Sequence, residues 1–181
     1  MTVMLTLTGY TREAYLDLVS DIRRIIPNVT LSTDVIAGFC GETEEEHQDT
    51  LLLMETVKFD RAFMFAYSAR PKTPAVRRYQ DDVPEATKSR RLQEIIALFQ
   101  RGAIERNRAL VGSRQIVLVE GINTKNEAQI KGKTDGFHVC FVAREGLNAE
   151  ELTGKYIEVE ITNATSQVLQ AKFIRETSII L

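Results

Sequence analysis

The sequence predicts an α/β part followed by a small all-β barrel. Two observations lead to this class. A strand pattern, a helix pattern and a second strand pattern follow one another between Val29 and Tyr67, as in a parallel β-α-β unit. From Ser113 onward the hydrophobic period shortens to that of strands, and glycine, asparagine and aspartate divide the chain into five short segments. A long helical stretch that ends near Leu110 joins the two parts.

The composition is that of a soluble globular protein, with 44% hydrophobic and 27% charged residues among 181. The net charge of −2 excludes a chain that binds nucleic acid through its overall charge. Residues 70–108 nevertheless contain ten Lys and Arg against five Asp and Glu. This stretch predicts either a phosphate-binding belt or a solvated helix face. No run of 18 apolar residues occurs, so we expect no membrane span.

The first predicted helix begins at Glu13 and ends at Ile26, with Thr11 as its N-cap and Pro27 as its stop. Its buried face is expected to contain the apolar residues at helical spacing, Tyr15, Leu18, Val19, Ile22, Ile25 and Ile26. The uncharged residues 1–8 form a separate lead-in. The first eleven residues contain neither Arg nor Lys, which makes them a poor secretory signal and a poor transit peptide.

The β-α-β unit is expected to contain a strand at Val29–Ala37, a helix at Thr43–Val57 and a strand at Arg61–Tyr67. Thr43 and Glu46 have the spacing of a capping box at the start of the helix. The second strand is apolar from Ala62 onward, which predicts that both of its faces are covered. Ligands of such units bind beyond the carboxyl ends of the strands, so Gly38–Thr43 and Tyr67–Thr73 are expected to converge.

The sequence supplies no partner for the strand edges of this unit. Two parallel strands and two helices cannot cover both faces of a buried sheet or close its edges. The remaining sequence supplies no further parallel strands. We therefore expect the first half to pair with another chain, or to be the end of a larger sheet whose beginning is missing.

A basic loop and a long helix follow the second strand. The loop is predicted at Ser68–Gln80, and the helix from an Asp82 cap, with Pro84 in its first turn, to about Leu110. Its buried stripe is expected at Leu92, Ile95, Ile96, Phe99 and Ala103, with basic side chains over much of the remainder, at Lys88, Arg90, Arg91, Arg101, Arg106 and Arg108. Gly112 ends the helix.

The five short strand patterns are at Arg114–Glu120, Glu127–Thr134, Phe137–Ala143, Lys155–Asn163 and Val168–Thr177. Evenly spaced strands in about 65 residues predict a small antiparallel barrel of the oligonucleotide-binding type. The domain boundary is expected near Val111. This gives an α/β domain at residues 9–110 and a barrel at residues 111–181.

Three motifs have the order and spacing of a known family. They are Ser32-Thr33-Asp34-Val35-Ile36-Ala37-Gly38-Phe39-Cys40-Gly41-Glu42-Thr43-Glu44-Glu45, Ala66-Tyr67-Ser68-Ala69-Arg70 and Asp81-Asp82-Val83-Pro84-Glu85. The chain resembles the MiaB-like methylthiotransferases from about Gly9 to Arg175. Cys40 and Lys72, where most of that family has Pro and Gly, are similar to its mitochondrial branch. Residues 1–8 do not match the family.

The resemblance implies a radical enzyme that uses S-adenosylmethionine and two [4Fe-4S] clusters to thiomethylate an adenosine beside the tRNA anticodon. It implies the C-terminal part of a partial radical-enzyme (β/α) barrel, followed by a TRAM domain that binds the anticodon stem-loop. The family's N-terminal cluster domain and its Cys-x-x-x-Cys-x-x-Cys loop are not in this sequence. We therefore expect a C-terminal fragment of a tRNA-2-methylthio-N6-dimethylallyladenosine synthase, inactive without the N-terminal region. The branch implies a mitochondrial location, with the cytoplasm as the alternative.

Cluster chemistry limits what this chain does alone. A radical-generating cluster needs three thiolates and one open iron position, and the sequence contains only Cys40 and Cys140. We expect no catalytic residue, no metal ligand and no stoichiometric cofactor in the isolated chain. Cys40 is better explained as a small buried thiol than as a ligand, and Cys140, within an apolar strand pattern, as a core residue.

The resemblance also assigns candidate binding residues. Ile36, Gly38 and Phe39 match the strand motif that packs against the cofactor's adenine, although a tight turn that needs glycine explains the motif equally well. The other residues that line this mouth by resemblance are Tyr67 and Ser68 for the cofactor and Arg70 and Thr73 for cofactor or RNA. Arg70 has a structural alternative, an ion pair with Asp34 or Glu42.

The barrel has its own candidates. Phosphate contacts are expected from Arg114, Lys131, Lys133, Lys155 and Lys172, and Phe137 is either a base-stacking platform or a core residue. Two other functions stay open. The chain is alternatively a standalone RNA-binding or regulatory module without catalysis, or a truncated product whose first half is poorly stable.

Overall fold

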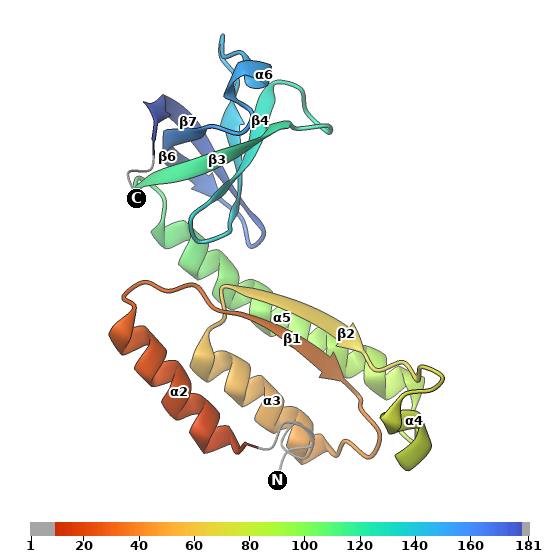
Figure 1. The fold of residues 1–181 in the computed structure, drawn as a ribbon. Helices are drawn as coiled ribbons and strands as arrows, with labels where there is room; N and C mark the ends of the chain where they lie inside the picture. Colours follow the sequence, from red (N-terminus) through yellow and green to blue (C-terminus); the bar gives the residue numbers. More distant parts are fainter. Residues whose placement is uncertain (1–9, 179–181) are drawn as a thin grey trace. The chain divides into compact units, whose positions relative to one another are not determined.

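The computed structural model describes residues 10–178, which form two compact units. The first unit ends at Gln100 and the second begins at Arg101, so the division falls within one long helix (Figure 1). An α/β unit followed by a closed five-stranded barrel confirms the predicted fold class. The predicted lead-in at residues 1–8 lies outside the described residues. Among residues 10–178, no helix combines the length and apolar character that a membrane span requires.

The helices and strands of the first unit are α2 (Arg12–Ile25), β1 (Ser32–Ala37), α3 (Glu44–Val57), β2 (Arg61–Ala66), α4 (Pro74–Arg78) and the larger part of α5 (Glu85–Ala109). β1 and β2 pair in parallel, from Ser32 opposite Arg61 to Ala37 opposite Ala66. The predicted β-α-β order is therefore confirmed. α4 was not predicted, because five residues are too few for a periodic pattern.

Local capping fixes where these helices begin. The Thr43 hydroxyl accepts from the Glu46 N–H at 3.2 Å, and the Glu46 carboxylate accepts from the Thr43 N–H at 3.0 Å, which confirms the capping box. The predicted Asp82 cap is wrong. α5 begins at Glu85, and the Asp82 carboxylate accepts instead from the Gly41 N–H.

Only one face of the two-stranded sheet is covered. Helices α2, α3 and α5 pack against it through a core that contains Val19, Ala37, Leu53, Met54, Val57, Phe59 and Ile95. On the opposite face Ile36, Phe63 and Phe65 are 53%, 48% and 54% exposed. The prediction that both faces of the second strand are covered is thus wrong for the described residues. A single layer of helices lies against the sheet, so every second residue of β2 faces outward.

The second unit is a barrel whose strands are all paired on both sides. The strands are β3 (Arg114–Ile122), β4 (Gln129–Thr134), β5 (Val139–Ala143), β6 (Tyr156–Ala164) and β7 (Val168–Thr177), with a short helix α6 (Ala149–Leu152) between β5 and β6. Their order is β3-β4-β5-β7-β6. The pairs are antiparallel except β5 and β7, which are parallel, so the prediction of an antiparallel barrel is wrong for this one pair.

The barrel interior is apolar. Its fully buried residues include Val117, Ile130, Cys140, Val142, Ile157, Val159 and Leu169. Cys140 is therefore a core residue, as predicted, and burial raises the pKa of its thiol from 9.0 to about 12. A thiol that is protonated at neutral pH inside a strand is an inert packing group.

Candidate functional site

The turn after β1 has a backbone that requires glycine. Gly38 and Gly41 both adopt φ near +74°, the left-handed region that other residues avoid. A Cβ atom on Gly38 would lie 2.4 Å from Cγ of Lys88 on α5. A Cβ on Gly41 would meet open space. Gly38 is therefore fixed both by its conformation and by the close approach of α5.

Side chains of the same chain bind the N–H groups of this turn. The Gly38 N–H donates to Oε2 of Glu42 at 2.7 Å, and the Gly41 N–H donates to Oδ1 of Asp82 at 2.6 Å. Arg91 donates from Nη1 to Oε2 of Glu42 at 2.8 Å and to the Glu42 carbonyl oxygen at 2.9 Å. The turn is thus fastened to the segment 81–91 by two carboxylates and one guanidinium group.

Aromatic rings gather beside the turn. The Phe39 ring makes edge-to-face contacts with Tyr67 at 5.0 Å and Tyr79 at 5.8 Å between centroids. Nζ of Lys88 lies 5.5 Å from the centre of the Tyr67 ring. A side-chain hydrogen bond with Cys40 raises the pKa of Tyr67, and desolvation adds to this effect. The carboxyl ends of β1 and β2 therefore bring Gly38, Phe39 and Tyr67 together, as predicted from the topology.

The other two cofactor candidates lie at the same strand ends. Ile36 is on the uncovered face of β1, opposite Phe65 of β2 in the parallel register. Ser68 is exposed, two residues after β2 ends. The structure places both near the mouth, and their part in cofactor binding stays a prediction.

Lys88 and Arg91 are buried, which corrects the prediction that they belong to the basic side chains covering the helix outside its buried stripe. Lys88 is 1% exposed and its ammonium group contacts Asp81 at 2.7 Å and Glu85 at 2.9 Å. Desolvation acts against the charged form of Lys88, but the bonds to these two carboxylates outweigh it and raise the pKa of Lys88. Arg91 is buried against Glu42. These two cations hold carboxylates of the chain and are not exposed to a phosphate.

The loop after β2 retains exposed basic residues, Arg70, Lys72, Arg77 and Arg78. Within residues 10–178 Arg70 makes no ion pair, so its predicted alternative, a bond to Asp34 or Glu42, is not formed. Thr73 has a structural role, because its hydroxyl donates to the Arg70 carbonyl oxygen and caps α4. Lys72 adopts φ +70°, a conformation that favours glycine.

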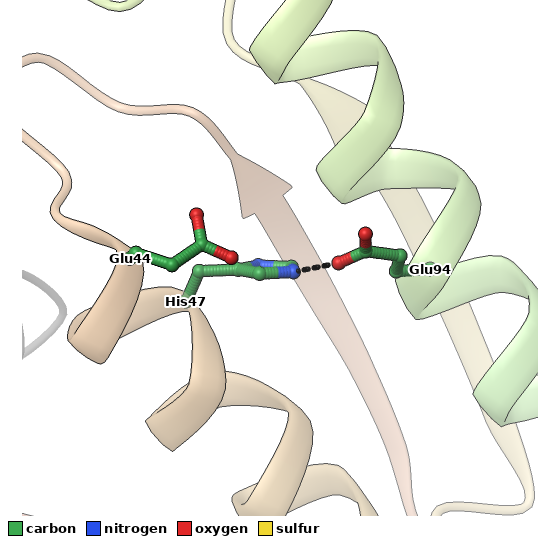
Figure 2. A group of neighbouring side chains, drawn as sticks. All are labelled: Glu44, His47 and Glu94. Atoms are coloured by element: carbon green, nitrogen blue, oxygen red, sulfur yellow. Dashed lines mark hydrogen bonds and ion pairs between the residues drawn. The ribbon is translucent and has the colours of Figure 1, made fainter.

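Glu44 and His47 of α3 meet Glu94 of α5 in a polar cluster (Figure 2). The buried His47 lies with Nε2 2.6 Å from Oε2 of Glu94. Both carboxylates also accept from Arg90, and Arg91 contacts Glu44 at 3.2 Å. Hydrogen bonds from Arg90 and then Arg91 lower the pKa of Glu44 from 4.5 to about 2. Two guanidinium groups therefore already neutralise the oxygens that a cation would need.

Each barrel cation predicted to contact phosphate has an acidic neighbour. The pairs are Arg114–Glu158 (3.5 Å), Lys131–Glu120 (3.0 Å), Lys133–Glu120 (3.1 Å), Lys155–Glu176 (3.1 Å) and Lys172–Glu160 (3.1 Å). The cations are 36–67% exposed, although the Glu158 side chain is only 12% exposed, and ion pairs at a protein surface contribute little stability. The cations remain reachable, although a phosphate has to compete with a carboxylate at each of them.

Phe137 is not in the core. It lies at the turn between β4 and β5 with φ +62° and its ring is 57% exposed, with Nζ of Lys133 5.2 Å from the ring centre. Of the two predicted alternatives, the core position is therefore wrong. An exposed aromatic ring offers a face on which a base can stack, and the stacking role of Phe137 stays a prediction.

The cysteines do not form a cluster site in this chain. Cys40 and Cys140 are both buried and lie in different units. The three thiolates that a radical-generating cluster needs are absent from the sequence, so the residues present do not fit that group.

Sequence reasoning missed the attachment of the turn to α5. The signal was the spacing of Lys88, Arg91 and Ile95, which continues the buried stripe of the helix toward its start. A basic residue on an apolar helical stripe is expected to be buried only when a carboxylate accompanies it. Glu42, the partner of Arg91, lies in a distant segment and could not be assigned from spacing, whereas Glu85 lies three residues before Lys88 on the same helix.

Comparisons with known proteins agree with this arrangement. Residues 108–174 match the TRAM domain. The chain is 45% identical over 179 residues to the mitochondrial tRNA methylthiotransferase CDK5RAP1 of Homo sapiens, and 48% identical over 180 residues to a CDK5RAP1-like protein of Oryza sativa subsp. japonica. It is 47% identical over 171 residues to the tRNA-2-methylthio-N(6)-dimethylallyladenosine synthase of Chlorobium chlorochromatii. Each match covers 94% of this chain but only 30%, 30% and 37% of the respective relatives.

Proposed function

We propose that this chain, a TRAM-containing homologue of the C-terminal part of the tRNA methylthiotransferases, performs that part's work in thiomethylation of tRNA. It supplies one side of the cofactor crevice and the barrel that holds RNA. The observation that carries the proposal is the convergence of Gly38, Phe39 and Tyr67 at the strand ends, in a chain 45% identical to such an enzyme.

S-adenosylmethionine is the proposed ligand of the strand ends. The uncovered side chain of Ile36 and the rings of Phe39 and Tyr67 offer apolar surface for a flat base, so the residues fit the adenosine half. When bound beside a reduced cluster, this cofactor supplies radical and methyl-transfer chemistry. The chain's own residues orient it and shield it from water, and the cluster ligands must come from a region outside this sequence.

The proposed RNA partner is the anticodon stem-loop. Arg70 follows Tyr67 in the chain, Arg77 and Arg78 of α4 precede Tyr79, and all three are exposed to phosphate. The barrel adds its paired cations and the Phe137 ring. Because most barrel cations already have carboxylate partners, we expect weak binding that falls steeply with salt. We place this activity in mitochondria, following the names of the human and mouse relatives.

A chimera tests the proposal. The matching C-terminal part of the human relative is replaced by residues 9–178 of this chain, and methylthio-adenosine is measured in tRNA by mass spectrometry. Thiomethylation by the chimera is expected, and the isolated chain is expected to give none. A folded chimera that binds tRNA and S-adenosylmethionine but forms no product would overturn the proposal.

The alternative is a standalone RNA-binding module, and the closed barrel favours it because that unit completes its own core. Binding of the isolated chain to an anticodon stem-loop at 50 and 200 mM salt separates the two functions. Micromolar affinity that survives high salt, together with an inactive chimera, favours the module. Weak salt-sensitive binding with an active chimera favours the enzyme fragment.

A further inference from the structure

The turn between β1 and α3 has no free glycine donors. In many nucleotide sites the N–H groups of such a turn point at phosphate, which the helix N-terminus also attracts. Here the Gly38 N–H donates to Glu42 and the Gly41 N–H donates to Asp82. Two carboxylates therefore occupy the positions that phosphate oxygens would take, and they repel a second anion.

Glu42 keeps this position because Arg91 holds it. The two side chains are only 8% and 5% exposed, and a buried carboxylate is strongly disfavoured without a charged partner. Nη1 of Arg91 contacts both the carboxylate and the carbonyl oxygen of Glu42, so one group fixes the side chain and the backbone. The other nitrogen, Nη2, reaches Glu44 at the start of α3. Arg91, a residue of α5, thereby links α5 both to the turn and to the start of α3.

Lys88 secures the other end of the turn. Its alkyl chain packs on Gly38 so closely that a Cβ there would lie 2.4 Å from its Cγ. Its ammonium group is held by Asp81 and Glu85, beside the Tyr67 ring. The segment 81–91 thus determines the path of the turn, although none of its side chains is needed to touch a ligand.

We infer that Arg91 is a positioning residue that holds the Gly38–Thr43 turn through Glu42, and that the turn selects a ligand group without phosphate. The ligand contacts the Ile36 and Phe39 side chains, and the N–H groups of Gly38 and Gly41 stay bonded to Glu42 and Asp82. The inference rests on the proposed function only where it identifies this ligand as S-adenosylmethionine, a phosphate-free sulfonium nucleoside.

Amide exchange of the full chain tests the positioning role by nuclear magnetic resonance. Arg91→Met is expected to speed exchange of the Gly38 N–H about ten-fold or more, since it releases the carboxylate acceptor. Arg90→Met is the matched control. It removes the neighbouring guanidinium, which also pairs with Glu44, but makes no bond to Glu42. Gly38 exchange in this control is expected to stay within about two-fold of the wild type.

Arg91→Lys covers the case in which Arg91→Met unfolds the first unit, and barrel amides report whether the second unit is intact. Lysine keeps the charge but cannot serve the carboxylate and Glu44 together, so a several-fold rise in Gly38 exchange is expected. Wild-type protection of Gly38 in folded Arg91→Met, or in Arg91→Lys when the first variant unfolds, overturns the positioning role.

Inorganic phosphate tests the selectivity. Its titration into the wild-type chain is expected to leave the Gly38 and Gly41 amide resonances in place. A saturable shift confined to these two amides overturns the selectivity. Both measurements use neither cofactor nor RNA, so an inactive chimera leaves them standing, and their failure leaves the proposed function untouched.

Discussion

The barrel and the α/β unit differ in how far they bury the apolar residues of their strands. Every barrel strand is paired on both sides, and its inward residues are sealed in one apolar interior. The two strands of the first unit each keep an edge without a strand partner within residues 10–178, and one face of their sheet exposes Ile36, Phe63 and Phe65. Closure makes the barrel a self-sufficient unit, whereas the open sheet keeps apolar surface available for a ligand or another segment.

Polar groups follow the same division. In the barrel the charged side chains lie outside and pair across neighbouring strands, as Lys131 and Lys133 do with Glu120. In the first unit Lys88 and Arg91 lie inside and fasten the turn that carries the proposed site. Charge serves solubility in one region and the geometry of a turn in the other.

The largest difference is expected in hydrogen exchange. Barrel amides such as those of Ile157 and Leu169 open only with the whole unit, whereas β1 and β2 open locally because each has a free edge. We expect exchange in β1 and β2 to be about 1,000-fold faster, equivalent to ~4 kcal/mol. Mass spectrometry of peptides from residues 32–37, 61–66 and 156–164 measures it. Equal protection in all three would refute the contrast, and loss of protection throughout residues 10–67 would favour a truncated product.

Core substitutions give the next largest effect. Ile157→Ala in the barrel is expected to lower the free energy of unfolding by about 3–4 kcal/mol, because it removes a fully buried side chain and leaves a cavity. Phe65→Thr on the open face of β2 is the matched change, and we expect less than ~0.5 kcal/mol, since its ring is already half exposed. Urea unfolding of both variants measures the difference. A cost for Phe65→Thr that equals the cost for Ile157→Ala would show that the open face is covered in solution.

This contrast also decides how much the sequence could predict. The Thr43–Glu46 capping box, the parallel unit and the five barrel strands depend on local spacing, and the structure confirms them. The exposure of Phe63 and Phe65 depends on how many layers cover a sheet, which no window of sequence contains. Family resemblance led to the strand ends, where Phe39 and Tyr67 do meet.

Pairing between distant charges was beyond prediction. Asp82 has the sequence signature of a helix cap, yet its carboxylate binds the Gly41 N–H forty-one residues away. Arg91 was expected on a basic helix face, yet the carboxylate of Glu42, forty-nine residues away, holds it inside. In each case a tertiary contact outweighed a local preference.

The two turn glycines separate conformational strain from packing. Gly38→Ala and Gly41→Ala both place alanine at φ near +74°, at a cost of about 1 kcal/mol for the left-handed backbone. Only Gly38→Ala also meets Lys88, so we expect a further ~1–3 kcal/mol from overpacking. The difference between their free energies of unfolding is the measurement. A difference near zero would mean that α5 moves aside freely. The turn would then not be rigidly attached to α5.

Acid is expected to have the smallest effect, and it acts through a different carboxyl in each unit. A carboxyl whose pKa is lowered by folding adds stability above its unfolded pKa near 4.5, and that stability is lost as pH falls through the folded pKa. Hydrogen bonds from Lys131 and then Lys133 lower the pKa of Glu120 in the barrel. In the first unit the pKa of Glu44 is about 2, so its contribution persists to lower pH than that of an ordinary carboxyl.

Removal of each main cation tests this assignment. Arg90→Met is expected to return the Glu44 pKa toward 4.5, which lowers the stability of the first unit above pH 4.5 and reduces the part of that stability that is lost as pH falls from 4.5 to 2, with the barrel profile unchanged. Lys131→Met is expected to have the corresponding effect on the barrel, through the pKa of Glu120, with the profile of the first unit unchanged. Urea midpoints recorded separately for β1–β2 and for β6 between pH 2 and 7 give both profiles. If either variant changes both profiles equally, the two units do not titrate independently. The assignment of Glu44 to the stability of the first unit and of Glu120 to that of the barrel would then be wrong.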